Sequence, residues 1–129
     1  MTYSVEKLPD EPIVISTISA SFSMDQYEQF LDDLTELLDM QTEPVYHVTV
    51  VNKHSFSFQE VLVSTNRSSR GPNPILHHPN LAGMVTVTTN KIIRLASKGL
   101  NSEIFGNIHI DLFETMDEAL DFVRSRVTA

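Results

Sequence analysis

The residues most suited to catalysis follow one apolar stretch of the chain. Residues 52–55 read Asn-Lys-His-Ser, so an imidazole and a hydroxyl adjoin at His54 and Ser55. A histidine-activated serine needs contact between the two groups and an acid that orients the histidine. Neighbouring residues on a turn rarely meet that geometry, and no orienting acid lies nearby in the sequence. We therefore expect no catalytic pair here, and the chain also lacks a glycine-rich phosphate loop, a dinucleotide fingerprint and a Gly-x-Ser-x-Gly elbow.

The other histidines raise the question of a metal site. His77 and His78 with His54 could bind a divalent metal, because imidazole is a common ligand. Consecutive histidines often point apart, and no His-x-x-x-His or carboxylate spacing accompanies them, so we favour packing within a loop. His47 lies inside the apolar stretch and is predicted to be a hydrogen-bonded core residue. His109 is predicted to face outward or an interface.

The apolar stretch from Val45 to Asn52 is predicted to be an interior strand. Five of its eight residues are β-branched, and it contains no glycine or proline. Such a run suits a strand that is covered on both faces, as in a parallel sheet between helices. Sites in open α/β sheets form at the carboxyl ends of the strands. We therefore expect the working surface at residues 52–57 and in the long loop from Gly71 to Gly83.

Alternating patterns along the rest of the chain predict an α/β fold. Further strands are expected at Tyr3–Leu8, Ile13–Ser19, Met84–Thr88 and Ile108–Phe113. Helices are expected after capping boxes at 23–26, 57–60 and 115–118, and after a cap at Thr88, Thr89 or Asn90. The expected fold is a single domain, residues 1–129, with a mostly parallel five-stranded sheet, an N-terminal antiparallel strand pair and about four helices. All four glycines are expected in loops or at the ends of elements. The helix that follows the cap at Thr88, Thr89 or Asn90 is expected to turn one apolar stripe inward: Ile92, Ile93, Leu95, Ala96 and Leu100.

Composition narrows the classes of partner. The 129 residues fit one domain, and 17 acids against 9 bases give a net charge of −8. That balance argues against nucleic acid and against an anionic membrane surface. No window approaches the ~20 apolar residues of a membrane span, and the N-terminus has no apolar signal core. The absence of cysteine excludes disulfides, thiol nucleophiles and Cys-zinc sites, and it agrees with a cytoplasmic setting.

Two surfaces remain open to more than one interpretation. The first predicted helix carries acids along its outer face: Asp25, Glu28, Asp32, Asp33, Glu36 and Asp39. This face is either a docking surface for a basic partner or a solvated helix face, which is common on soluble domains. The largest apolar side chains, which form the core or line a cleft for an apolar ligand, are Phe22, Phe30, Phe56, Phe58, Phe105, Phe113 and Phe122.

The order of elements and two segments resemble a known group. Residues 110–120, Ile-Asp-Leu-Phe-Glu-Thr-Met-Asp-Glu-Ala-Leu, are similar to the strand-to-helix ending of many small SpoIIAA-like proteins, and residues 78–100 look like small bacterial proteins of that kind. The chain thus resembles the STAS-like group, the fold of anti-sigma-factor antagonists with SpoIIAA-like and lipid-binding SEC14-like relatives. The resemblance implies that fold and leaves function open.

The resemblance also implies a modification site. In anti-sigma-factor antagonists a serine at the start of the helix after the central strand is phosphorylated, and the matching positions here are Ser55 and Ser57. The group places an aspartate directly before that serine, whereas this chain has His54 and Phe56 there. The alternative is that both serines are helix caps or turn residues.

These observations predict a cytoplasmic, non-enzymatic STAS-like module that acts through protein contacts, as a homodimer. No catalytic, cofactor or metal residue is assigned. The expected interaction or ligand surface comprises Asn52, Lys53, His54, Phe56, Phe58, Ile75, His77 and His78. The alternative is a carrier for a small apolar or lipid-like ligand in a cleft at the carboxyl ends of the strands, which a cavity of ~300 Å³ or more under the loop would favour.

Overall fold

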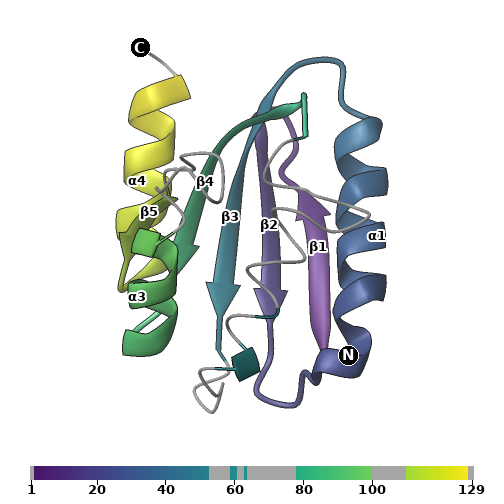
Figure 1. The fold of residues 1–129 in the computed structure, drawn as a ribbon. Helices are drawn as coiled ribbons and strands as arrows, with labels where there is room; N and C mark the ends of the chain where they lie inside the picture. The colour runs from purple at the N-terminus through teal and green to yellow at the C-terminus, as the bar shows by residue number, and fades with distance from the viewer. Residues whose placement is uncertain (1, 53–58, 61–62, 64–77, 100–109, 128–129) are drawn as a thin grey trace.

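The computed structural model describes residues 2–52, 59–60, 63, 78–99 and 110–127 (Figure 1). The elements within them are β1 (Tyr3–Lys7), β2 (Ile13–Ile18), the 3-10 helix η1 (Met24–Gln26), α1 (Tyr27–Asp39), β3 (Val45–Val51), β4 (Leu81–Val87), α3 (Lys91–Gly99), β5 (Ile110–Phe113) and α4 (Met116–Val127). Most of the helix expected after the capping box at 57–60 lies outside these residues, and so does His109.

The five strands form one sheet in the order β1-β2-β3-β4-β5. Strand β1 runs antiparallel to β2, and all the other neighbours are parallel. The predicted topology is therefore confirmed, including the interior position of β3, whose stretch of β-branched residues pairs on both sides. Strand β1, which contains the polar residues Ser4, Glu6 and Lys7, is an edge strand.

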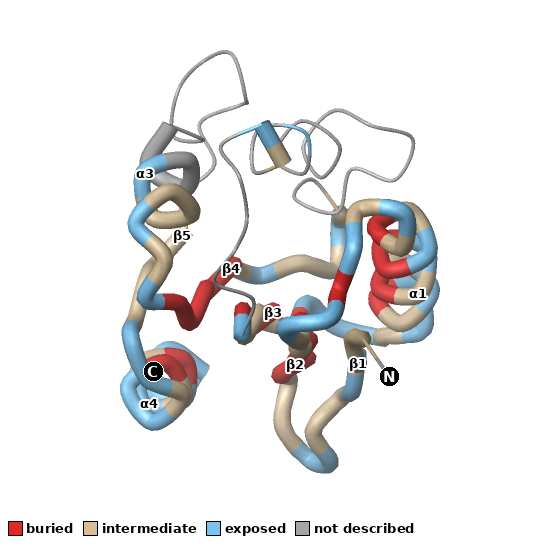
Figure 2. The backbone as a smooth tube through the Cα atoms, turned by 90° about the horizontal axis from the view of Figure 1, so that it is seen from below, coloured by how far each residue is buried: buried red, intermediate tan, exposed pale blue. Residues whose placement is uncertain are grey.

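The helices cover the sheet from two sides (Figure 2). Helices α1 and α3 lie over one face, and α4 lies over the other. Each connection between parallel strands steps in the same direction across the sheet, so right-handed crossovers place the connecting helices on the same face. Helix α4 follows the last strand and makes no crossover, so it is able to cover the opposite face.

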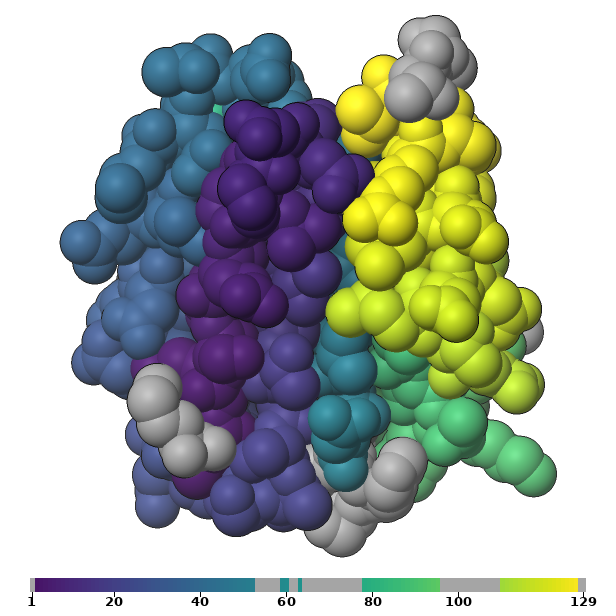
Figure 3. Space-filling view, turned by 180° about the vertical axis from the view of Figure 1, so that it is seen from behind, coloured from purple at the N-terminus to yellow at the C-terminus, as the bar shows by residue number. Residues whose placement is uncertain are grey.

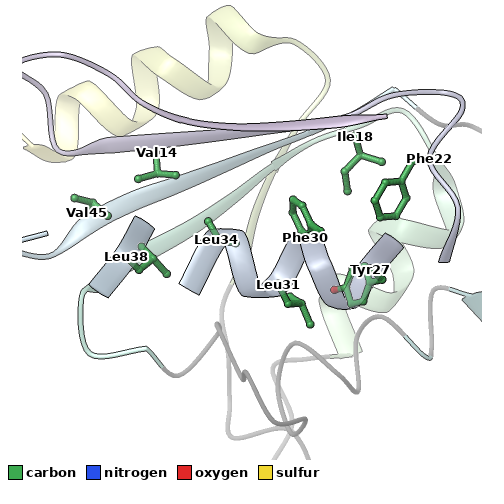
Figure 4. Close-up of a cluster of buried hydrophobic side chains, with 9 residues drawn as sticks. All are labelled: Val14, Ile18, Phe22, Tyr27, Phe30, Leu31, Leu34, Leu38 and Val45. Carbon is green, nitrogen blue, oxygen red and sulfur yellow. The ribbon is translucent and has the colours of Figure 1, made fainter. Parts of the chain in front are cut away.

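The alternation of side chains along the strands divides the core into two clusters. The first lies under α1, and Figure 4 shows its side chains: Val14, Ile18, Phe22, Tyr27, Phe30, Leu31, Leu34, Leu38 and Val45. The second lies under α4 and contains Ile13, Ile15, Val48, Val85, Val87, Ala119 and Val123. Phe22 and Phe30 are therefore core residues, as the packing interpretation predicted. On the same side of the molecule as α4, none of the described helices covers the edge strand β1 (Figure 3), and its Ser4 and Glu6 are exposed.

Polar side chains begin the helices where the sequence predicted them. The side chain of Asn90 accepts the N–H of Ile92 over 2.8 Å, which selects Asn90 among the three candidate caps. The hydroxyl of Thr115 accepts the N–H of Glu118 over 3.3 Å. The capping box at residues 23–26 is also present. These caps satisfy backbone donors that the first turn of a helix leaves without partners.

Two local predictions are wrong. Leu95 was expected to face inward but is 64% exposed. At about 100° per residue it lies roughly 110° from the centre of the face that Ile92 and Ile93 share, so it falls at the margin of the stripe. Gly83 was placed in a loop, but β4 begins at Leu81, and Gly83 lies inside the strand opposite Tyr46.

The ring of Tyr46 explains the glycine at position 83. A Cβ atom at Gly83 would lie 2.6 Å from Cε1 of Tyr46. We expect Gly83→Ala to lower the free energy of unfolding by about 1–3 kcal/mol, because the ring must move out of its packed position. Urea denaturation of the two single variants and of the Gly83→Ala/Tyr46→Ala double variant checks this. The cost of the alanine should largely disappear when Tyr46 is already truncated; equal costs in both backgrounds would contradict the steric explanation.

Helix α1 contains one buried hydroxyl without a hydrogen bond. Within the described residues, Oγ1 of Thr35 has no partner. We expect Thr35→Val to raise the free energy of unfolding by about 1 kcal/mol, because the substitution keeps the shape and removes the cost of burying that oxygen. Thermal and urea unfolding measure the change. Thr35→Ser, which keeps the hydroxyl, should give no gain, and a gain from both variants would contradict the prediction.

Candidate functional site

The structure describes few of the residues predicted to form a surface at the carboxyl ends of the strands. Asn52 is exposed directly after β3, and its N–H donates to the carbonyl of Ile18 over 2.8 Å. The following predicted site residues lie outside the described residues: Lys53, His54, Ser55, Phe56, Ser57, Phe58, Ile75 and His77. The predicted phosphorylation of Ser55 or Ser57 therefore stays a prediction.

His78 lies at the opposite end of the sheet from Asn52, which corrects the prediction that the two share one edge. His78 precedes β4, whose first residue Leu81 pairs with Val45, the first residue of β3. The seven residues of β3 separate these two ends by about 23 Å at the usual rise of ~3.3 Å per residue. Residues 78–80 thus lie at the amino ends of the parallel strands, where they pack against the end of α1.

Hydrogen bonds hold His78 against α1. Its Nε2 lies 2.6 Å from Oδ1 of Asp39, and its Nδ1 accepts the N–H of Asn80 over 3.0 Å. The amide of Asn80 donates to the carbonyls of Leu38 and Gln41 over 2.9 and 3.1 Å. These bonds satisfy carbonyls that the end of a helix leaves without partners. Both nitrogens of His78 are therefore engaged in packing the loop.

His47 lies in the centre of the sheet, on the side of α1. Its Nε2 is 2.7 Å from the hydroxyl of Ser16 and 3.3 Å from that of Thr49, and its Nδ1 is 3.1 Å from the sulfur of Met84. His47 is 1% exposed, and burial lowers its pKa from 6.5 to about 4. The imidazole is therefore neutral near pH 7, and the prediction of a hydrogen-bonded core histidine is confirmed.

The Ser16–His47 pair has only part of the geometry of a nucleophilic site. A thioether rather than a carboxylate faces Nδ1, so no acid orients the ring or stabilises an imidazolium. Ser16 is 0% exposed, so a substrate has no access to its hydroxyl. Throughout the segments that the structure describes, no three His, Asp or Glu side chains are grouped closely enough to hold a metal.

A groove runs between the edge strand β1 and helix α1. Its volume is about 340 Å³, and it is lined by Tyr3, Ser4, Val5, Asp33, Glu36, Leu37 and Met40. On the helix these positions follow i, i+3, i+4 and i+7, which places them in one stripe along a single face. Met40 is 70% exposed at one end of the stripe. We call this set of seven residues the β1–α1 groove.

Acidic groups dominate the helix side of the β1–α1 groove. The segment from Met24 to Asp39 contains six acids and no lysine or arginine. The phenol of Tyr3 donates to Oδ2 of Asp33 over 2.5 Å, and the side chain of Gln29 donates to Oδ1 over 2.8 Å. Burial and the contact with Asp33 raise the pKa of Tyr3 to about 12, so the phenol remains a donor near neutral pH. The groove therefore has a fixed negative wall.

Aromatic packing fixes the strand side of the β1–α1 groove. The ring of Tyr3 makes edge-to-face contacts with Phe22 and Phe30, at centroid distances of 6.0 and 5.5 Å. Such contacts stabilise ring pairs beyond the area that they bury. The side of Tyr3 that lines the groove is therefore supported by core residues from the connection before α1 and from α1 itself.

Comparison with known proteins defines the fold. No family model matches the chain, and no curated protein matches its sequence. It is similar to the crystal structure of an uncharacterized protein of the DUF3478 family with a SpoIIAA-like fold from Shewanella loihica PV-4. The TM-score is 0.59 at 14% sequence identity, over 94% of this chain and 91% of the other. The chain has a SpoIIAA-like fold.

The SpoIIAA-like fold confirms the architecture that the sequence resemblance implied, and at 14% identity the likeness concerns the fold alone. The β1–α1 groove is formed by two of its elements whose contact residues are separated by about thirty positions in the chain, as with Tyr3 and Asp33. Sequence analysis identified the acidic helix face but not the strand beside it. Among the described helices, none is long and apolar enough to cross a bilayer.

Proposed function

We propose that this chain is a non-enzymatic interaction module that binds another protein at the β1–α1 groove. The observation that supports the proposal is the combination in that groove of an apolar floor, formed by Val5, Leu37 and Met40, with a fixed acidic wall. Met40 is 70% exposed, and Asp33 is held by two hydrogen bonds rather than lying free in solvent. Surfaces that combine exposed apolar groups with a polar rim are typical of protein-binding sites.

The alternative functions have less support. The Ser16–His47 pair is buried and neutral, which disfavours an enzymatic role for it. The groove of about 340 Å³ lies at the sheet edge and carries two carboxylates, Asp33 and Glu36, which suits a polar chain better than a lipid. We further propose a cytoplasmic setting, which the absence of cysteine supports. A homodimer through this groove would bring two acidic helices together, so we favour a different protein as the partner.

Photo-crosslinking in the native cell tests the proposed function. A benzophenone amino acid at position 40 should capture a distinct partner protein, because that side chain lines the groove and is 70% exposed. The same probe at position 117, exposed on α4, is the matched control and should not capture that partner. The captured protein is then purified, and its affinity is measured by calorimetry with the unmodified chain and with Met40→Asp. Equal capture at both positions, or unchanged affinity of the variant, would reject the groove as the binding site.

A further inference from the structure

The outer edge of β1 presents backbone groups at a known set of residues. The carbonyl of Thr2 accepts from Ser19, and the N–H of Leu8 donates to Ile13, both over 2.9 Å. These bonds and the β1–β2 register mean that the even-numbered residues of β1 bond to β2. The N–H and C=O groups of the odd-numbered residues, Tyr3, Val5 and Lys7, therefore point away from β2. Within the described part of the chain, no strand pairs with β1 on that side.

The side chains beside this edge form a receptor for alternate residues of an added strand. Tyr3 and Val5 direct their side chains to the face under α1, where both line the groove. Residues of an added strand that point to the same face would meet Leu37 and Met40, together with Asp33 and Glu36, along one stripe of α1. Edge strands accept such pairing readily, because their backbone donors and acceptors are already in strand geometry.

Charge decides which strand fits this edge. The helix beside the edge carries six acids and no base from Met24 to Asp39, and the whole chain has a net charge of −8. A second copy of the chain paired edge to edge would bring its own acidic helix into this field, which like charges oppose. An extended segment with lysine or arginine and apolar residues is complementary to both the wall and the floor. The Nζ of Lys7 donates to the carbonyl of Leu8 at one end of the edge. Because of this positive charge, the acidic environment of the edge is limited to residues 3–5.

We propose that the β1–α1 groove binds an extended basic segment of a partner protein, which adds to the sheet as a sixth strand beside β1. This inference rests on the proposed function and specifies its mode of recognition. Backbone bonds to Tyr3, Val5 and Lys7 supply the pairing. Asp33 and Glu36 select basic side chains, and Leu37 and Met40 receive apolar ones.

A synthetic peptide tests the binding mode directly. The probe is a capped seven-residue peptide, Lys-Lys-Val-Val-Lys-Lys-Val, in which lysine and valine alternate along each face of the extended strand. It is titrated into the ¹⁵N-labelled chain. Hydrogen exchange of the amides of Tyr3, Val5 and Lys7 should slow about tenfold or more, because these three become bonded. The amides of Ser4 and Glu6 already face β2 and should change little. Protection elsewhere, or none at the three odd-numbered residues, would overturn the proposal.

Modified peptides separate strand addition from charge attraction. A strand bonds to its neighbour through the backbone of every second residue. N-methylation of the peptide residues that face β1 should therefore weaken binding by about tenfold or more, whereas N-methylation of the residues between them should have little effect. Equal effects of the two sets would refute strand pairing. A peptide with glutamate in place of lysine should not bind.

Charge-reversed variants of the protein test the acidic wall. Glu36→Lys should weaken peptide binding about fivefold or more, whereas Asp121→Lys on α4 makes the same change in net charge and should alter it less than about twofold. Equal weakening by both would show non-specific attraction and overturn the proposal. Sedimentation of the protein alone checks the self-pairing alternative: a dimer that protects the same three amides without peptide would replace the partner segment by a second copy.

The outcomes also separate this inference from the proposed function. If position 40 captures a partner that binds tightly without slowing exchange at Tyr3, Val5 and Lys7, the groove binds protein but not as an added strand, and only the inference fails. If the peptide slows exchange at these amides but position 40 captures no partner in the cell, strand addition holds and the proposed function fails.

Discussion

Acidification from pH 7.5 to pH 4 is expected to destabilise the chain by about 3 kcal/mol through His47 alone. The pKa of this buried imidazole is about 4 in the folded state against 6.5 in an exposed one. Below pH 6.5 the unfolded chain binds a proton that the folded chain does not, so stability falls as the pH decreases to about 4 and levels off below it. Each unit of difference in pKa corresponds to about 1.4 kcal/mol. Urea denaturation at pH 7.5, 5 and 4 measures the loss.

A glutamine variant separates His47 from the carboxylates that also titrate in this range. His47→Gln replaces the imidazole by an amide that can still bond to Ser16 but does not gain a proton in this pH range. The free energy of unfolding that this variant loses between pH 7.5 and 4 should therefore be smaller than the loss in the parent by about 3 kcal/mol. The control is His78→Gln, at the histidine that packs against the end of α1. This variant should lose nearly as much free energy of unfolding between pH 7.5 and 4 as the parent does. In the unmodified protein, the NMR signals of the His47 ring should not titrate between pH 8 and 5. Identical pH profiles for His47→Gln and the parent would contradict the prediction.

Phe22→Ala is expected to lower the free energy of unfolding by about 3–5 kcal/mol. The side chain is 1% exposed and packs edge-to-face against Tyr3, Tyr27 and Phe30, at centroid distances of 6.0, 6.4 and 6.1 Å. Truncation removes a large buried ring and leaves a cavity that the surrounding rings only partly fill. Urea denaturation measures the loss. The N-terminal edge strand should also loosen, because Tyr3 loses one of its two edge-to-face neighbours.

The control for Phe22 is a phenylalanine on the other face of the sheet. Phe122 is half-buried on α4, where it contacts Phe113 at 5.3 Å and lies under the guanidinium of Arg126. Phe122→Ala should cost about 1–2 kcal/mol, because less of the ring is removed from water. Hydrogen exchange at Tyr3 and Val5 should accelerate in Phe22→Ala beyond the global change and follow only the global change in Phe122→Ala. Equal unfolding costs for both variants would refute this account of the core.

The sequence predicted the elements whose signals are local and strong. The β-branched stretch from Val45 needs burial on both sides, so its central place in the sheet followed from composition, and alternation of elements gave the parallel topology. Caps such as Asn90 and Thr115 act on backbone groups two or three residues away. Their positions were therefore readable without knowledge of the tertiary structure.

Features that depend on contacts across the chain were not predicted. Position 83 of β4 is a glycine because the Tyr46 ring of the neighbouring strand takes the space of a Cβ atom. His78 lies at the amino end of the sheet, where it bonds to Asp39 and Asn80. The β1–α1 groove requires Tyr3 to meet Asp33, a pairing that neither segment reveals alone. The acidic helix face was visible in the sequence, but the sheet edge that lies beside it was not.

The strands occupy the sheet in the same order as they occur in the sequence, β1 to β5. During synthesis, each strand that leaves the ribosome therefore finds its predecessor already available as a neighbour, and no later strand has to insert between two earlier ones. Domains of this kind can grow stepwise from the N-terminus, since local closure precedes long-range pairing. We expect a nascent chain that ends after β3 to have already buried the Phe22 and Leu34 side chains between α1 and the sheet.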